Sequence, residues 1–213
     1  MTLASPSADE FIAFRNQCVF LRSLSRHQQI LFEHIDPAGS QRMKNAAHIF
    51  FSDLNRLLIT HIILQVCCLT DPPRDVRGNE SLTLDFLVHH YGLRTNAQLM
   101  ALRDRLMAFR DKVKAARHKL ISHSDRKATI ADMPLGAASN DEWREFWSDL
   151  DDFLHIAGKC ILDDEIFRLD DVAHLSDADG LLKALVHAEL FDDLLSDNDP
   201  AIARKCAELA LKQ

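Results

Sequence analysis

The sequence has few of the residues that interrupt helices. Only 6 glycines and 6 prolines occur in 213 residues, and these residues normally mark the turns between short strands. No stretch of useful length alternates apolar and polar residues in the manner of a half-buried strand. Both absences argue against a sandwich or barrel of β-strands. Because 47% of the residues are hydrophobic, we predict a helical protein that can bury a substantial core.

Cysteine spacings that bind metals or carry redox chemistry are also absent. The five cysteines are odd in number and none forms a CxxC pair, so neither a disulfide framework nor a zinc site is expected. We interpret the cysteines as reduced core residues. The N-terminal sequence lacks the basic and apolar regions of a secretory signal, and we therefore expect a cytoplasmic protein.

No apolar run is long enough to predict a membrane span. The most apolar segment, Leu57–Leu69, contains His61 and Gln65 and is shorter than the roughly 20 residues that cross a bilayer. We interpret this segment as a buried core helix and expect no membrane association.

Positive charge is scarce overall but concentrated in one segment. The formal net charge is −7, which argues against a protein that coats nucleic acid. Between Arg103 and Lys127, nine basic residues stand against three acidic ones, so this segment carries +6 and the rest of the chain −13. Several acidic runs lie after Asn140, and such runs are typical of solvated helix faces.

The spacing of apolar residues predicts an all-α protein. Ser7 and Glu10 have capping-box spacing at the start of the first helix, and Asp36–Gly39 is predicted to end it. We expect an antiparallel up-and-down bundle of four long helices and one short helix over residues 1–168, with a C-terminal helical appendage, 169–213, packed on it. The expected helices cover residues 10–35, 40–70, 82–90, 95–122, 139–161 and 177–195, and a last one begins at Pro200.

The fourth predicted helix carries a line of basic side chains. Arg103, Arg110 and Arg117 are seven residues apart, so they lie within about 40° of one another around the helix, with Lys114 beside them. We call these four residues the basic rail. The rail borders the apolar stripe of the same helix. Its arginines therefore either guide a nucleic acid backbone or lay their stems over the edge of the core.

Arg117 and His123 are the strongest candidates for chemistry. In one unbroken helix they would point roughly 120° apart, so a shared site needs one of two geometries. Either the helix ends near Ser122 and His123 folds back, or two chains pool two arginines and two histidines in one cleft.

The two side chains suit RNA cleavage without a metal. A histidine with a pKa of about 6.5 can take the proton of a ribose 2′-OH, and a guanidinium can stabilise the charge on the attacked phosphate. The alternative interpretation is that His118 and His123 are solvated residues, favoured by the dipole at a helix C-terminus.

Several motifs resemble one known family. Arg117-His-Lys-Leu-Ile-Ser-His123 resembles the Arg, spacer, His signature of the HEPN superfamily. Leu69-Thr-Asp-Pro72, Gly78–Leu82 and Leu102–Leu106 are similar to the abortive-infection AbiU-type branch, over roughly residues 10 to 160. Many members have Asn after the arginine and Ala before the histidine, where this chain has His118 and Ser122. The resemblance implies a helical homodimer whose shared cleft cleaves RNA without a metal.

From these observations we predict a set of site residues. Asp71 and Asn79 could orient His123 or receive substrate if the loop 71–80 packs near the end of the fourth helix, although capping the third helix is the other interpretation. Asp152 with His155, and Asp171 with His174, have helical metal-ligand spacing but lack the partner glutamates of a di-iron bundle, so no metal or cofactor is expected. The predicted catalytic residues are Arg117 and His123, and the predicted substrate-binding residues are His118, Lys119, Lys114, Arg110 and Asn79.

The resulting prediction is a HEPN-type endoribonuclease, a toxin or anti-phage effector that forms a 2′,3′-cyclic phosphate. Expected partners are a second copy, RNA, and an antitoxin or nucleotidyltransferase. The alternative is a non-catalytic helical dimer that binds a protein or nucleotide through the same cleft. In a third interpretation, the acidic C-terminal appendage covers the basic rail as an inhibitor.

Overall fold

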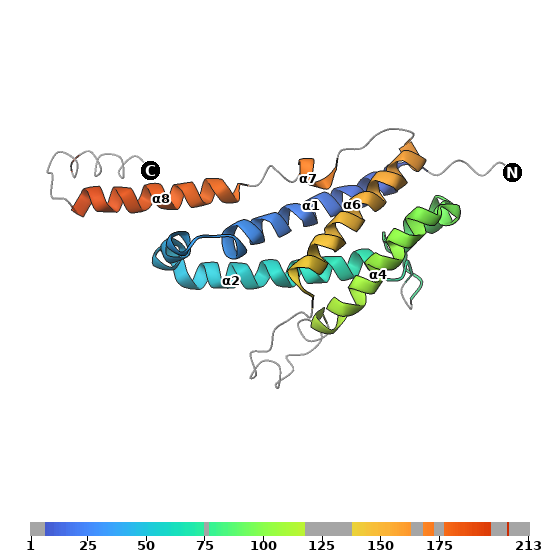
Figure 1. The fold of residues 1–213 in the computed structure, drawn as a ribbon, viewed down its shortest axis with the longest axis horizontal. Helices are drawn as coiled ribbons and strands as arrows, with labels where there is room; N and C mark the ends of the chain where they lie inside the picture. Colours follow the sequence, from blue (N-terminus) through green and yellow to red (C-terminus); the bar gives the residue numbers. More distant parts are fainter. Residues whose placement is uncertain are drawn as a thin grey trace. The chain divides into compact units, whose positions relative to one another are not determined.

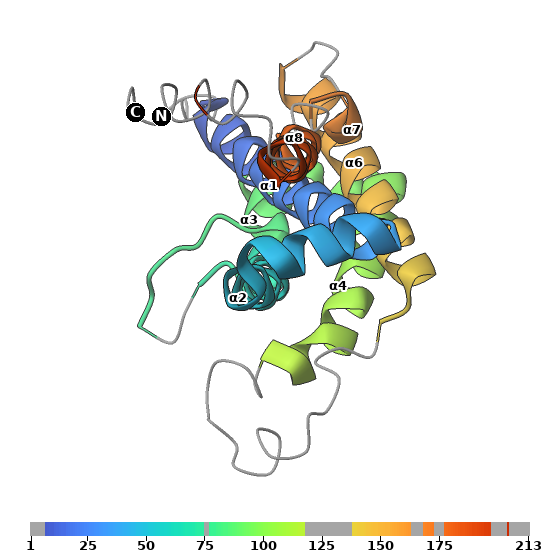
Figure 2. The same cartoon turned by 90° about the vertical axis from the view of Figure 1, so that its left-hand side faces the viewer.

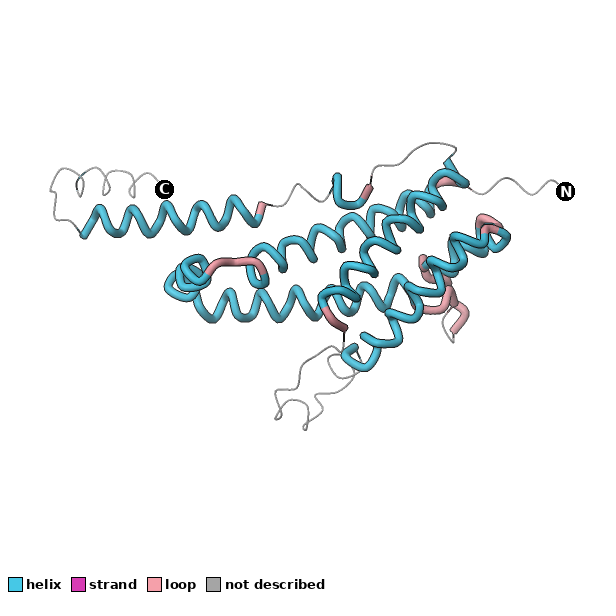
Figure 3. Tube along the Cα trace, viewed as in Figure 1, coloured by secondary structure: helices cyan, strands magenta, loops and turns pink. Residues whose placement is uncertain are grey.

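The computed structural model describes residues 7–74, 77–117, 138–162, 168–172, 177–196 and 204. Within these ranges every regular element is a helix, apart from one isolated bridge between Arg74 and Glu80 (Figures 1 and 3). The all-α prediction is therefore confirmed, and the antiparallel up-and-down order stays a prediction. The elements are α1 Asp9–Gln28, the π-helical turn η1 Gln29–Glu33, α2 Pro37–Thr70, α3 Leu84–His90, the 3₁₀ turn η2 Leu93–Thr95, α4 Ala97–Arg117, α6 Asn140–Leu162, α7 Leu169–Val172 and α8 Ala178–Ser196.

The described residues group into two compact units. The first unit draws on residues 1–25 and 57–175, and the second on residues 26–56 and 176–213. Helix α8 is thus grouped with the end of α1 and the start of α2, and α7 with the first unit. The sequence-based boundary at residue 168 stays a prediction, and the segment from Pro200 lies outside the described residues except for Arg204.

The first helix differs from its prediction at both ends. At its start, Ser7 Oγ accepts a hydrogen bond from the backbone N–H of Asp9 (3.2 Å), while the carboxylate of Glu10 lies 3.3 Å from Tyr91 Oη. The predicted capping box is therefore wrong, because Glu10 contacts a residue distant in sequence. At its end, the α-helix stops at Gln28 and continues as the π-helical turn, which shifts the register by about one residue.

Helix α2 begins earlier than predicted. Asp36 Oδ1 accepts a hydrogen bond from the N–H of Gly39 (2.6 Å), so Asp36 caps α2 instead of only ending the preceding helix. Pro37 occupies the first helical position, where its missing N–H costs nothing. A Cβ on Gly39 would lie 2.7 Å from Ile35 Cγ1, so this tight entry needs glycine.

The core of the first unit forms where α4 and α6 pack side by side (Figures 1 and 2). The apolar stripe predicted on α4 is buried from Leu99 to Ala116, and Leu120 lies outside the described residues. Phe109 of α4 stacks on Phe146 of α6, with ring centroids 4.7 Å apart. Helices α1, α2 and α3 add further buried residues to the same cluster, among them Phe11, Phe14, Cys18, Val66, Leu84 and Leu87.

Helix α2 has one buried and one exposed side. Ile62, Val66 and Leu69 are buried, as predicted for Leu57–Leu69, but Leu57 is 66% exposed. Among the described residues, α2 is the one helix long and apolar enough to cross a membrane, and 22% of its apolar window is buried. A single such helix is weak evidence for a membrane span, because the core helix of a protein without any membrane segment can be equally long and apolar.

The cysteines also divide between core and surface. Cys18 and Cys67 are buried, whereas Cys68 and Cys160 are exposed. The prediction of core cysteines is therefore wrong for the last two. Cys206 lies outside the described residues.

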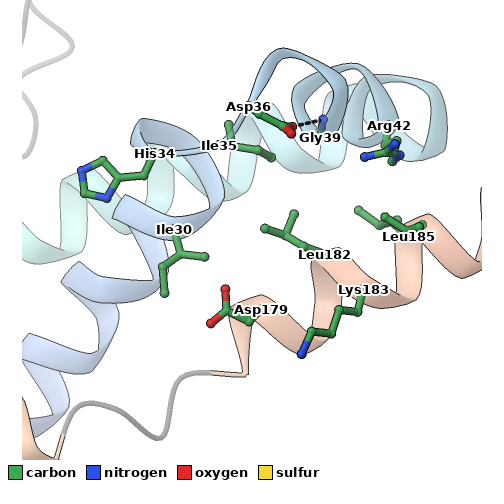
Figure 4. A pocket seen from close by; sticks show the side chains of 11 residues that line it. Ile30, His34, Ile35, Asp36, Gly39, Arg42, Asp179, Leu182, Lys183 and Leu185 are labelled. Carbon is green, nitrogen blue, oxygen red and sulfur yellow. Dashed lines mark hydrogen bonds between the residues drawn. The ribbon is translucent and has the colours of Figure 1, made fainter.

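The second unit contains a cavity of about 430 Å³ between α8 and the start of α2 (Figure 4). Leu182 of α8 points across this cavity toward the segment that carries Ile35 (Figure 4). Two charged residues at its edge already have structural partners, because Asp36 caps α2 and Arg42 binds Glu189. The cavity is therefore lined by both apolar and charged side chains.

The predicted capping box at the start of α6 is confirmed. The N–H of Ser139 donates to Glu142 Oε2 (2.7 Å), and the N–H of Glu142 donates to Ser139 Oγ (3.3 Å). Lys112 of α4 also binds Glu142. The hydrogen bond from Lys112, followed by those from Ser139, lowers the pKa of Glu142 to about 2.

We predict that Phe146→Ala destabilises the first unit by about 3–5 kcal/mol, because it leaves a cavity beside Phe109 and removes buried apolar surface. Arg144→Ala is the matched control on the same helix. Among the described residues, Arg144 pairs with Asp141 alone, and both side chains are exposed, so its loss should change stability by less than about 1 kcal/mol. Urea unfolding followed by circular dichroism measures both values. Equal effects of the two substitutions would contradict the packing described.

A second prediction concerns acid. The pKa of Glu142 is lower in the folded chain than its ordinary value of 4.5, so its contribution is fully present above about pH 4.5 and is lost as the pH falls through about 2. Glu142→Gln should therefore lower the melting temperature near neutral pH, and the difference from wild type should shrink at more acidic pH. Calorimetry across this range tests it. A difference that stays constant down to about pH 2 would show that the charge contributes nothing.

Candidate functional site

One carboxylate at the end of α2 binds two arginines of α4. Arg110 Nη2 donates to Asp71 Oδ1 (2.7 Å). Arg117 Nη1 donates to both oxygens of Asp71, at 3.0 Å from Oδ1 and 2.9 Å from Oδ2. Arg110 and Arg117 are two helical turns apart and share one face of α4. We call these three residues the Asp71 cluster.

The local sequence places Asp71 at this position. Thr70 is the last residue of α2; it is buried, and its hydroxyl donates to the carbonyls of Val66 and Cys67 (2.8 and 3.1 Å). Pro72 disfavours a helical conformation at the preceding residue, so Asp71 stands just outside the helix. A carboxylate at a helix C-terminus faces the negative end of the dipole. The two guanidinium groups offset this repulsion.

The members of the cluster differ in exposure. The side chain of Arg110 is 13% exposed and that of Arg117 is 29% exposed. Arg110 Nε is buried and finds no hydrogen-bond partner among the described residues. Arg117 is therefore the arginine that is more accessible to a ligand, and Arg110 is the more buried partner of Asp71.

The electrostatics of the site follow from these contacts. Partial burial lowers the pKa of Arg117, but the charge of Asp71 and its hydrogen bonds outweigh this effect, and the pKa is raised overall. Burial raises the pKa of the neighbouring thiols Cys67 and Cys68, and the charge of Arg117 partly opposes the rise. Arg117 therefore stays cationic beside two thiols that stay neutral.

Most other basic residues of α4 are paired with carboxylates. Arg103 binds both oxygens of Asp85 on α3, at 2.7 and 2.9 Å, and Arg105 binds Asp149 on α6. The basic rail is thus a real line of side chains, but Arg103 serves the packing of α3. Lys114 forms no ion pair with the described part of the chain.

Sequence reasoning missed the role of Asp71 as the partner of Arg117. Of the two interpretations given for Asp71 and Asn79, capping of α3 is wrong, because Thr83 Oγ1 accepts the hydrogen bond from the N–H of Phe86, and the role of Asn79 in substrate binding stays a prediction. Asn79 lies exposed between α2 and α3. The signal for Asp71 was the Leu69–Pro72 motif, which was noted without a partner for its carboxylate.

Three predicted site residues, His118, Lys119 and His123, lie outside the described residues. Their roles and the two geometries for Arg117 and His123 stay predictions. Of the weighed metal pairs, Asp152 accepts a hydrogen bond from Arg168 (2.6 Å), and His155 Nδ1 is buried without a partner among the described residues. His174 also lies outside the description.

Comparison with known proteins gives one match. A search of curated proteins and a search of solved structures find no match. The family model described as AbiU2, of the HEPN group, matches residues 7–180. This range is more than half of the chain and holds the Asp71 cluster together with the segment from Arg117 to His123. The chain therefore belongs to the AbiU2 family of HEPN proteins.

Proposed function

We propose that the protein is a metal-independent endoribonuclease of the HEPN type. The observation that carries the proposal is the guanidinium of Arg117, which is fixed on Asp71 at the end of α4 while the side chain stays 29% exposed. His123 follows six residues later in the sequence. A cation held in place and a titratable imidazole are the two groups that this reaction requires.

The proposed reaction is an internal transfer of the phosphate. His123 takes the proton of a ribose 2′-OH, and the 2′-oxygen attacks the adjacent phosphorus. The bond to the 5′-oxygen of the next nucleotide breaks, and that oxygen is protonated by the acid form of a histidine. The products are a 2′,3′-cyclic phosphate and a 5′-hydroxyl. Arg117 stabilises the extra negative charge on the phosphate oxygens in the transition state.

We further propose that two chains form the active unit. Phe20 is 59% exposed and its ring meets that of His61 edge-on, at 6.4 Å between centroids. Leu57 and Cys68 are eleven residues apart on α2, so they lie within about 20° of one another around the helix. An exposed apolar face thus leads along α2 to Cys68, which is electrostatically coupled to Arg117. Covering this face with a second copy would bring both sets of Arg117 and His123 together.

The biological role that we propose is abortive infection, as the name of the family indicates. The protein would act in the cytoplasm as a toxin or anti-phage effector, with an antitoxin or a nucleotidyltransferase as its regulator. The competing proposal is a non-catalytic dimer that binds a protein or nucleotide at the same cleft. The paired charges of α4 favour a site that contacts few phosphates over a surface that binds RNA indiscriminately.

The cleavage prediction uses single-stranded RNA with EDTA present. Wild type should cleave it, and Arg117→Ala and His123→Ala should each lower the rate by about 100-fold or more, because each removes a group that acts in the transition state. Arg105→Ala is the matched control, since Arg105 lies on the same helix but pairs with Asp149. Equal cleavage by wild type and His123→Ala would contradict the proposal. Binding without turnover, abolished by Arg117→Glu, would favour the competing one.

The dimer prediction concerns α2. Leu57→Asp should convert particles of twice the mass of one chain into single chains, because it places a charge in the apolar contact. RNA cleavage should be lost with it. Arg56→Ala changes an exposed neighbour that points about 100° away and should leave the mass unchanged. Light scattering after size exclusion measures the mass, and a wild-type protein with the mass of one chain would contradict the prediction.

A further inference from the structure

The Asp71 cluster differs from a simple ion pair, because two guanidinium groups share the two oxygens of one carboxylate. Asp71 Oδ1 accepts from both Arg110 and Arg117, and Oδ2 accepts from Arg117 alone. The two guanidinium groups and the one carboxylate to which both donate leave one net positive charge, and the only other carboxylate paired with them among the described residues, Asp111, is exposed and 3.9 Å from Arg110 Nη1. The pairs that Arg103 and Arg105 make on the same helix are neutral or acidic, since each arginine meets at least one carboxylate of its own.

The cluster also retains donors for a further anion. Both hydrogen bonds from Arg117 to Asp71 use Nη1, and its Nε and Nη2 form none with the described residues. These two nitrogens are the edge of the guanidinium that binds two oxygens of a phosphate side by side. Arg110 Nη1 is 3.9 Å from the exposed Asp111, so this donor too has only a distant partner.

We propose that Asp71 is a positioning residue which holds Arg117 through Nη1, so that the opposite edge of the guanidinium receives one phosphodiester of the RNA backbone. This inference rests on the proposed function and adds Asp71 and Arg110 to its site. A phosphodiester carries one negative charge and neutralises the cluster. Asp71 therefore sets both the direction in which Arg117 points and the charge that the substrate meets.

The hydrogen bonds of Asp71 predict how Asp71→Asn would change the attachment of Arg117. If the amide oxygen takes the place of Oδ1, it keeps its contacts with Arg110 and Arg117. The amide nitrogen then takes the place of Oδ2 and faces the donor Arg117 Nη1, which was 2.9 Å from an acceptor. Arg117 therefore loses half of its attachment, and the cluster rises from one net positive charge to two.

Affinity and turnover should consequently change in opposite directions. For a 2′-O-methyl oligoribonucleotide, which cannot be cleaved, we expect Asp71→Asn to bind about threefold tighter or more at low salt, with a salt dependence steeper by about one unit. The rate of RNA cleavage should fall between about tenfold and 100-fold, because Arg117 is no longer held in the reactive orientation. A general loss of structure would weaken both properties together.

Three further variants make the test specific. Asp85→Asn breaks the two-oxygen pair of Arg103 on the same helix, adds the same charge to the chain, and should leave affinity and rate unchanged. Asp71→Glu keeps the carboxylate and should restore the wild-type affinity and part of the rate. In the double variant with Arg117→Ala, Asp71→Asn should no longer tighten binding.

The outcomes separate this inference from the function on which it rests. Wild-type affinity and rate in Asp71→Asn would overturn the inference and leave the nuclease standing. A joint fall of affinity, rate and melting temperature would also overturn it, since Asp71 would then be only structural. If wild type binds the oligoribonucleotide without cleaving RNA, and Asp71→Asn tightens that binding, the nuclease proposal fails and the phosphodiester site is supported.

Discussion

The burial of one apolar stripe on α4 fixes where every charge of that helix points. Leu99, Leu106 and Val113 recur every seven residues and are buried, so the helix cannot rotate without exposing them. Arg110 and Arg117 then lie along one border of the stripe, where α2 ends, and Arg105 lies along the other, against α6. The ion pairs follow from this hydrophobic packing, because the burial of the stripe decides which carboxylates the arginines can reach.

The sequence predicted the helices well because each one carries its own periodicity. The stripe of α4 and the capping box of Ser139 and Glu142 depend on residues within a few positions of each other, and both are present. The wrong predictions concern residues whose contacts are made with residues distant in the sequence. Glu10 was expected to cap α1 but meets Tyr91, which no local pattern reveals. The division into two units is also invisible locally, because α2 contributes to both units and the non-helical backbone at Ala47 within it has no proline or glycine to announce it.

Only the arginines of the candidate site, and not their carboxylate partner, could be predicted from the sequence. The spacing of Arg110 and Arg117 showed that they share a helix face, and the family resemblance singled out Arg117. Neither observation showed which carboxylate they meet, because Asp71 lies 46 residues before Arg117 and reaches it only after α2 and α4 pack together. The exposure of Leu57 was not predicted either, because Leu57 has the apolar character of a core residue and only the packing of the helices shows that it faces outward.

Arg110 and Arg117 can both bind Asp71 because they lie two helical turns apart, so the number of residues between them cannot change freely. Inserting or deleting one codon between positions 110 and 117 would swing the second guanidinium about 100° around the helix, away from the carboxylate. The connection between α2 and α3 has no comparable limit beyond its first residue, because surface loops tolerate added residues. Natural length variation among relatives should therefore collect in such loops and spare this stretch of α4.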